Sequence, residues 1–226
     1  MTSKAIAIFP TMIYTNNFDP KISDKLLPFL SPYDFSSADG IQGEFLGLAD
    51  MHLDNNLSDF YKMIVNEAGI YIDTLGINVN LFDLYIVKST LSKISKPDHH
   101  FMPHKHFCAD ISFVYYVKVP PGSDNLFFLN EHRPNELFGH MFDDVRERNM
   151  LTQFNAFNST AHYINPEAGL LVMFPGKLSH GTRKLSPEQF KGDRIAIVGD
   201  INLVLKPEQN NWETGKVDLS KWRKFT

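Results

Sequence analysis

Two histidines separated by one residue are the strongest chemical signal in the sequence. His104 and His106 lie in the stretch HHFMPHKHFCADISFVYYVKVP, residues 99–120. On an extended chain, residues i and i+2 point to the same side, so both imidazoles can face one ion. The β-type pattern that follows favours an extended chain, whose same face would continue from Asp110 to Tyr116. The pair therefore predicts a metal site, with a chance His-x-His in a surface loop as the alternative.

A third ligand is expected from a distant part of the chain. His180 occurs in the stretch FPGKLSHGTRKL, after the predicted strand 170–174 and the turn Pro175-Gly176. Neutral imidazole binds iron, copper, nickel and zinc alike, so the residues do not identify the metal. We expect His162 to pack near the site and the other histidines to serve no ligand role. Those others are His52, His99, His100, His132 and His140.

Short apolar segments separated by turn residues position these histidines. Many short strands with few helices between them favour a β-sandwich or jelly roll over a parallel α/β sheet. A strand broken by Pro10 is expected at 5–14, before the helices described below. The other predicted strands are 84–91, 111–119, 125–129, 153–157, 161–164, 170–174 and 194–205.

Helices are expected mainly before residue 82. One is short, at 22–30. A longer one is predicted from Leu57 to Leu75 by apolar residues spaced three to four apart, with Asn56 or Ser58 as its cap and Gly76 as its end. We expect these helices to buttress a sheet and to carry no chemistry.

The polar segment 130–152 is predicted to be an insertion between strands, with a helical turn around 136–146. A long insertion of this kind is typical of a lid, a binding loop or a subunit contact. Its apolar residues could close a lid or form a homodimer interface. These are Leu137, Phe138, Met141 and Phe142.

Composition limits the class of protein. A chain of 226 residues, 43% of them hydrophobic, can form one domain over 1–226 with a core large enough to bury a site. Cys108 is the only cysteine, which excludes an intrachain disulfide and predicts a reducing, cytoplasmic location. No segment has the length and apolar character of a signal peptide or a membrane span. The net charge of −4 argues against bulk nucleic-acid binding.

The region resembles the Fe(II)- and 2-oxoglutarate-dependent oxygenase superfamily, and within it an uncharacterised bacterial and phage group of the prolyl-hydroxylase-like branch. That group pairs an HxH motif with an SGVYYV-like strand, matched here by His104-Lys105-His106 and by SFVYYV at 112–117. Later blocks resemble LVMFP at 171–175, leading to His180, and the run from Arg194 to Asn202. The resemblance implies a mainly β, double-stranded β-helix (cupin-like jelly roll) with its core at about 82–205.

The ligand set departs from the usual one of this superfamily, which is two histidines and one carboxylate. The carboxylate normally lies two residues after the first histidine, a position held here by His106. The site therefore has three histidines, or Asp110 supplies the carboxylate, or only two protein ligands bind. We favour three histidines, because Asp110 would need a bulge in the chain to reach the ion.

The resemblance also implies a co-substrate pocket. Arg194 matches the arginine that grips the far carboxylate of 2-oxoglutarate, and Tyr116 matches a tyrosine that lends its hydroxyl to the same group. Arg183 is a rival cation that we expect to be exposed. The alternative for Arg194 is a salt bridge at the end of a strand. No side chain is expected to act as a general base, so none is nominated as catalytic.

The implied activity is an Fe(II)-dependent oxygenase, a hydroxylase, that converts 2-oxoglutarate to succinate and CO2 while oxidising a small-molecule or peptidyl substrate. One alternative is a cupin-type metalloenzyme that uses no keto acid. A second alternative, from another class, is a β-helix that binds a ligand or partner without turnover. Fold similarity does not choose the substrate.

Overall fold

The computed structural model describes residues 8–30, 36–37, 44–45, 50–139, 141–142 and 151–206. The helices in these ranges are α1 (Lys21–Leu30) and α2 (Ser58–Thr74), with the 3-10 turns η1 (Met51–Leu53), η2 (Asn55–Leu57) and η3 (Val79–Leu81). The strands are β1 (Tyr14–Asn17), β2 (Ser36–Ser37), β3 (Glu44–Phe45), β4 (Phe82–Ile94), β5 (Ile111–Lys118), β6 (Leu126–Leu129), β7 (Ala161–Ile164), β8 (Leu170–Pro175), β9 (His180–Thr182) and β10 (Arg194–Leu205).

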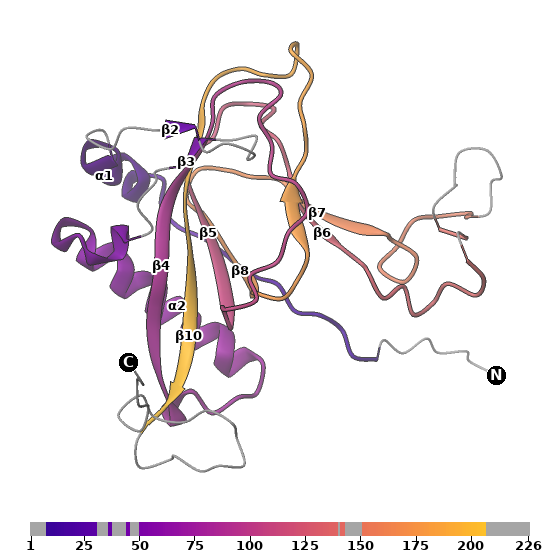
Figure 1. Ribbon diagram of the computed structural model, residues 1–226, viewed down its shortest axis with the longest axis horizontal. Coiled ribbons are helices and arrows are strands. Elements are labelled where there is room, and N and C mark those ends of the chain that lie inside the picture. Colours follow the sequence, from indigo (N-terminus) through magenta and orange to yellow (C-terminus); the bar gives the residue numbers. More distant parts are fainter. Residues whose placement is uncertain are drawn as a thin grey trace, which may run out of the picture.

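The strands form two sheets. The larger sheet has the order β1-β8-β5-β10-β4-β3-β2, and the smaller has the order β7-β6-β9 (Figure 1). All strand pairs in both sheets are antiparallel, and most neighbours, such as β5 and β10, are distant in sequence. Two packed antiparallel sheets with long-range pairing are typical of a jelly roll. The predicted double-stranded β-helix is therefore confirmed.

Both faces of the large sheet are covered. Phe113, Tyr115 and Met173 belong to a core shared with the helices, whereas Tyr116 and Phe174 belong to a second core shared with β6 of the small sheet. Successive side chains of a strand point to opposite faces, so a strand covered on both sides needs apolar residues at nearly every position. This explains the unbroken apolar runs in β5 and β8.

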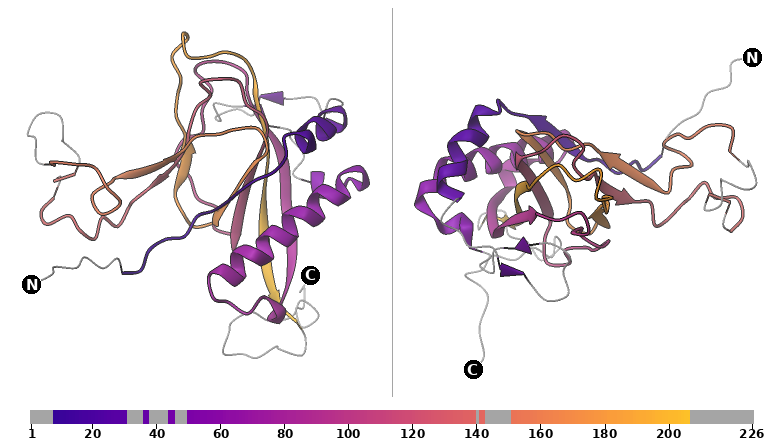
Figure 2. Two further views of the ribbon diagram at one scale, coloured as in Figure 1. Left: turned by 180° about the vertical axis from the view of Figure 1, so that it is seen from behind. Right: turned by 90° about the horizontal axis from the view of Figure 1, so that it is seen from above.

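The helices buttress the large sheet on the face away from the small sheet, with α2 lying across its strands (Figure 2). The predicted apolar face of α2 is buried, and Gly76 ends the helix with a φ of 75°. Leu75, however, is exposed, and neither Asn56 nor Ser58 caps the helix. Leu57 is the N-cap residue, because the 3-10 turn η2 already leads into α2. None of the described helices has both the length and the apolar character needed to cross a membrane.

Two predicted strands are wrong. Residues 8–13 form no strand, and the first strand begins at Tyr14 and pairs with β8; residues 5–7 lie outside the described part. Residues 153–157 form turns, because the side chains of Asn155 and Asn158 accept nearby backbone N–H groups and thereby compete with strand pairing. The other predicted strands agree with the structure to within a few residues, whereas β2, β3 and β9 were not predicted.

The connection between β6 and β7 extends away from both sheets (Figure 1). Its described residues, 130–139, 141–142 and 151–160, contain turns and bends. The helical turn predicted around 136–146 is absent from 136–139 and 141–142, and its other residues lie outside the described part. Leu137 and Phe138 are exposed, whereas Phe142 is buried.

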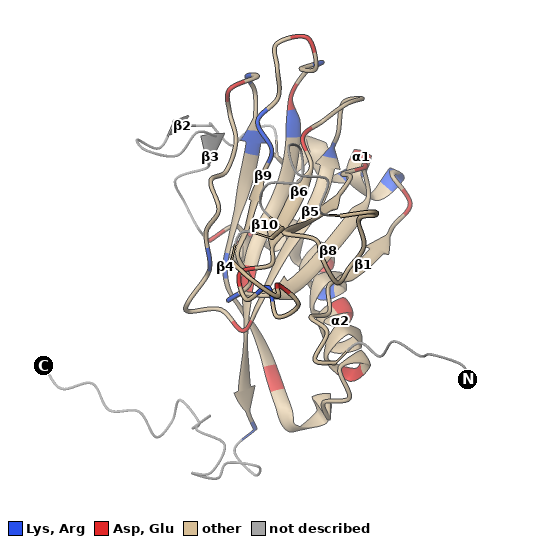
Figure 3. Cartoon of the chain, turned by 90° about the vertical axis from the view of Figure 1, so that its right-hand side faces the viewer, with Lys and Arg blue, Asp and Glu red and all other residues tan. Residues whose placement is uncertain are grey.

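Charged residues lie mainly at the strand ends and in the loops, while the strand bodies are almost free of charge (Figure 3). Three buried exceptions occur on the strands and loops around the second core: Asp124, Arg194 and Asp200. A charge that is taken out of water needs a specific partner. These three residues are accordingly central to the description of the site.

Candidate metal centre

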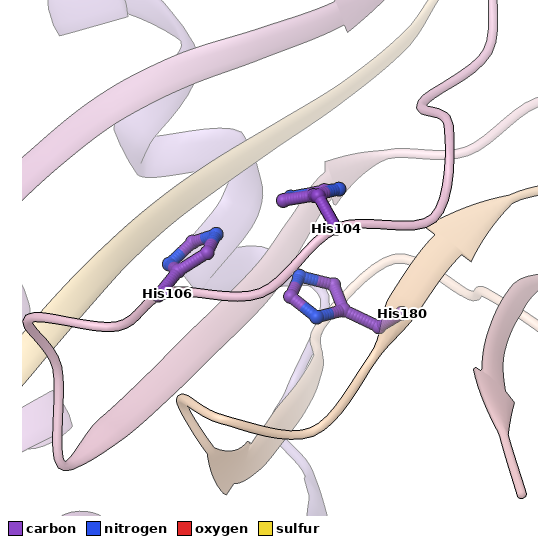
Figure 4. A group of neighbouring side chains, drawn as sticks. All are labelled: His104, His106 and His180. Atoms are coloured by element: carbon purple, nitrogen blue, oxygen red, sulfur yellow. The ribbon is translucent and has the colours of Figure 1, made fainter. Parts of the chain in front are cut away.

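The three predicted histidines meet. Each of His104, His106 and His180 offers one ligand atom, and these atoms lie within 4.8 Å of one another. The ring centroids are 4.4 Å apart for His104 and His180, and 5.2 Å apart for the other two pairs. His104 and His106 come from one loop and His180 from the neighbouring β9, and the three rings lie side by side (Figure 4). No other such group of ligands occurs in the described residues.

The extended chain predicted at the histidines does not continue without a break into the strand that follows. His104 forms an isolated antiparallel bridge with His180, and the chain turns before β5 begins at Ile111. The backbone N–H of His106 donates to the carbonyl of Gly176 at 2.8 Å. A Cβ at Gly176 would lie 2.5 Å from the carbonyl oxygen of Ala109, so only glycine allows this approach.

A hydrogen bond at Nδ1 orients each ring. His104 Nδ1 lies 2.8 Å from the carbonyl oxygen of Met102, and His180 Nδ1 lies 2.9 Å from that of Leu178. A carbonyl can only accept, so Nδ1 carries the hydrogen in both rings and the lone pair remains on Nε2. Histidine ligands of metals are held by outer partners in this way.

Burial favours the neutral form of His104 and His180. His180 is almost inaccessible, and burial lowers its pKa to about 3. Burial also lowers the pKa of His104 below its ordinary value. The rings of Phe128 and Phe174 cover His180, with centroids 6.3 and 4.5 Å from its ring. Neutral imidazoles with free Nε2 atoms are the form that binds a divalent transition metal.

His106 has a different partner, which the sequence analysis missed. Its Nδ1 lies 2.5 Å from Oδ1 of Asp200, and the hydroxyl of Ser112 donates to the same oxygen at 2.8 Å. The sequence contains one indication of this partner: Asp200 is an acid within the largely apolar strand RIAIVGDINLVL. It is an even number of residues from Arg194, so both side chains are expected on the same face of the strand. Asp110, the alternative ligand, is not in the cluster. Its Oδ2 accepts the backbone N–H of Leu203 at 2.9 Å.

The remaining histidines do not join the cluster. His162 lies on β7 and is exposed, so the expected packing role is wrong. His99 and His100 are half-buried and, as expected, do not belong to the cluster. His140 lies outside the described residues.

Arg194 is buried beside Tyr116 and is already paired. Its Nη1 donates to Oδ2 of Asp124 at 2.9 Å, and its guanidinium carbon lies 5.6 Å from the centre of the Tyr116 ring. Arg194 Nε and Asp124 Oδ1 have no hydrogen-bond partner among the described residues. Burial raises the pKa of Asp124, and Arg194 opposes this shift. The buried pair matches the salt-bridge alternative, although the free Nε still leaves a donor for a carboxylate.

The ion pair of Arg194 and Asp124 is connected to the metal centre through β9. Thr182, two residues after His180, faces the same side of the strand and helps to lower the pKa of Asp124 through a hydrogen bond. Two residues of a strand span about 6.6 Å. Arg183 is exposed, as expected, so Arg194 is the cation of this interior.

The fold and the site together define a double-stranded β-helix with a three-histidine cluster at one end of its interior. Residues 91–200, which contain all three histidines and Arg194, match the family model described as putative 2OG-Fe(II) oxygenase. Through that segment the chain is similar to this family. No protein of curated function matches the chain by sequence.

Solved structures share the fold. HygX from Streptomyces hygroscopicus, solved with nickel and 2-oxoglutarate, is 14% identical with a TM-score of 0.56, covering 85% of this chain and 83% of HygX. A prolyl-4-hydroxylase from Pseudomonas putida is 14% identical with a TM-score of 0.55, covering 85% and 92%. SnoN, a non-heme α-ketoglutarate-dependent epimerase from nogalamycin biosynthesis, is 11% identical with a TM-score of 0.57, covering 87% and 81%. These neighbours support the predicted jelly roll.

Proposed function

We propose that the protein is an Fe(II)- and 2-oxoglutarate-dependent oxygenase that hydroxylates a small-molecule or peptidyl substrate. The observation that carries the proposal is the convergence of three Nε2 atoms, each freed by a hydrogen bond at Nδ1, within the segment that matches the oxygenase family. HygX, which shares the fold, was solved with nickel and 2-oxoglutarate. With Fe(II) bound, the centre would supply O2 activation, in which 2-oxoglutarate gives succinate and CO2 and the substrate C–H becomes C–OH.

The residues of this chain have separate tasks in this proposal. The three histidines would hold the ion through their Nε2 atoms. Phe128 and Phe174 shield His180 from water. Arg194 binds the far carboxylate of 2-oxoglutarate and shares its charge with Asp124, while Tyr116 lies under the guanidinium.

The residues beside the ligand pair suggest where the substrate binds. Met102 and Phe107 flank His104 and His106 in sequence and are exposed, at 63% and 90%. Lys105 forms an ion pair with Glu131, at the start of the insertion, with 2.5 Å between Nζ and Oε2. We propose that a substrate with an apolar group contacts this rim, between the ligand loop and the insertion.

The proposal is tested by adding Fe(II) and then 2-oxoglutarate to the purified protein without oxygen. The expected result is a weak visible charge-transfer band that appears only with both additions, followed by succinate formation when O2 is admitted. Arg194→Ala should weaken 2-oxoglutarate binding, while Arg183→Ala, which changes an exposed arginine, should not.

The same experiment separates the alternatives. Iron binding without a band on addition of 2-oxoglutarate would favour a cupin-type metalloenzyme. The binding of neither would favour a β-helix that binds a partner without turnover.

A further inference from the structure

Three imidazoles leave the charge of a divalent ion uncompensated. Among the described residues, the atoms that converge with those of His104, His106 and His180 include no carboxylate oxygen. Asp110 is directed to the backbone of Leu203 instead. The negative charge that a carboxylate ligand would provide must therefore come from outside the ligand set, or be missing.

Asp200 is the acid that contacts the cluster. Its Oδ1 lies 2.5 Å from His106 Nδ1 and accepts the Ser112 hydroxyl at 2.8 Å, while its Oδ2 is 3.9 Å from Lys88 Nζ. The Asp200 side chain is only 2% exposed, whereas that of Lys88 is 49% exposed. Water screens the charge of Lys88, so the close and buried partner of Asp200 is the imidazole.

The backbone is shaped to place this carboxylate. The register of β10 against β4 shifts between Asp200 and Ile201, because Val87 of β4 has no partner on β10. Such an irregularity increases the local twist beside Asp200. At Gly199, a Cβ would lie 2.6 Å from the carbonyl oxygen of Lys88 and 2.6 Å from the Phe113 ring. Glycine therefore lets β10 approach its neighbours closely, immediately before the acid.

Burying the Asp200 carboxylate costs free energy of folding. A carboxylate buried in an apolar strand loses its hydration, and the loss is offset only where partners satisfy it. The partners here are one ligand histidine and the hydroxyl of Ser112, which also lies 3.1 Å from His106 Nδ1. The Asp200 carboxylate and the Ser112 hydroxyl thus both contact Nδ1 of His106.

We propose that Asp200 is a positioning residue of the metal centre, which aims Nε2 of His106 at the ion and supplies through that imidazole the negative charge that the ligand set lacks. This inference rests on the metal site of the proposed function. A carboxylate that accepts the Nδ1 hydrogen fixes the tautomer and makes Nε2 a stronger donor. The carbonyl partners of His104 and His180 fix the tautomer without adding a charge.

The test is a Co(II) titration of the metal-free protein, followed by its visible absorption. Loss of an outer partner typically weakens a metal site by roughly 10–100-fold. Asp200→Asn, which keeps the shape and removes the charge, is expected to weaken Co(II) binding by that factor and to shift the absorption bands. Asp110→Asn, the same change at the acid that contacts Leu203, is expected to stay within about twofold. Equal affinity and an unchanged spectrum for Asp200→Asn would overturn the proposal, as would a wild-type protein that binds no Co(II).

A second measurement needs no metal and no folded Asp200 variant. A short hydrogen bond to a buried carboxylate shifts the Nδ1 hydrogen of His106 to low field in the proton spectrum of the metal-free wild-type protein. The resonance should be absent from His106→Gln, and its absence from the wild type would contradict the pairing. Adding 2-oxoglutarate to the Co(II) protein separates the two proposals: if the spectrum does not respond, the oxygenase proposal fails while the role of Asp200 stands.

Discussion

His104 and His180 are joined by their backbones as well as by their rings. The N–H of His104 donates to the carbonyl of His180 at 2.9 Å, and the N–H of His180 donates to the carbonyl of His104 at 3.0 Å. This antiparallel bridge connects the ligand loop to β9 and brings the two ring centroids to 4.4 Å. The separation of these two ligands is therefore set by backbone hydrogen bonds rather than by flexible side chains.

The bridge depends on the glycine that follows His180. A Cβ at Gly181 would lie 2.6 Å from the carbonyl oxygen of Phe101 and 2.9 Å from the Phe127 ring. Gly181→Ala should therefore push the ligand loop away from β9, destabilise the protein by about 1–3 kcal/mol and weaken metal binding. Urea unfolding and Co(II) titration measure the two effects. Gly139→Ala is the control, because a Cβ there meets nothing within 4 Å, and equal behaviour of the two variants would contradict the prediction.

Removal of any one of the three histidines should abolish tight metal binding. His104→Ala and His180→Ala each remove one of three converging nitrogens. The decrease in metal affinity should therefore exceed the roughly 10–100-fold decrease that follows the loss of an outer partner. Calorimetric titration with Ni(II) measures the affinities. His162→Ala, on the exposed strand β7, should bind like the wild type. Wild-type affinity for Ni(II) in His180→Ala would exclude the three-histidine centre.

The metal-free protein should lose stability in mild acid because of His180. The pKa of His180 falls from 6.5 to about 3 on folding, so its neutral form stabilises the fold fully above pH 6.5 and progressively less as the pH falls toward 3. Between pH 7.5 and pH 5 the unfolded chain takes up a proton that the folded chain refuses, at a cost of about 2 kcal/mol.

Urea midpoints at the two pH values measure this loss. His180→Gln should show a smaller loss than the wild type, because it removes this group and leaves His104, whose pKa is also lowered. The prediction is wrong if the two proteins lose the same stability.

The buried pair of Arg194 and Asp124 should be strongly coupled. The exposed fractions of the two side chains are 4% and 1%, so truncating either leaves a charge without its partner, at a cost of about 3–5 kcal/mol. The double variant should cost much less than the sum, which a double-mutant cycle of urea unfolding would show.

Asp193→Ala provides the contrast from the neighbouring position. Its ion pair with Lys93 is 3.3 Å long and its side chain is 40% exposed, so the loss should be about 1 kcal/mol or less. A similar cost for Asp193→Ala and Asp124→Ala would contradict the burial argument.

The sequence alone allowed much of the fold to be predicted. Apolar periodicity located α2, and short apolar segments bounded by turn residues located strands β4 to β8 and β10. The apolar runs of β5 and β8 are unbroken because both faces of these strands are covered. The spacing of His104 and His106, with His180 after a later strand, identified the candidate ligands. Local hydrogen bonds at Asn155 and Asn158, which a pattern of apolar residues does not register, misled the prediction at 153–157.

Residue types and their spacing thus determined which imidazoles are available, since a histidine and its neighbours are local features of the chain. Only the tertiary structure decided their partners. The pairing of Asp200 with His106 depends on the register shift between β10 and β4, and that of Asp124 with Arg194 depends on the packing of a loop into the interior. Such pairs join residues far apart in the chain, and their hydrogen bonds form only after the sheets have closed around them.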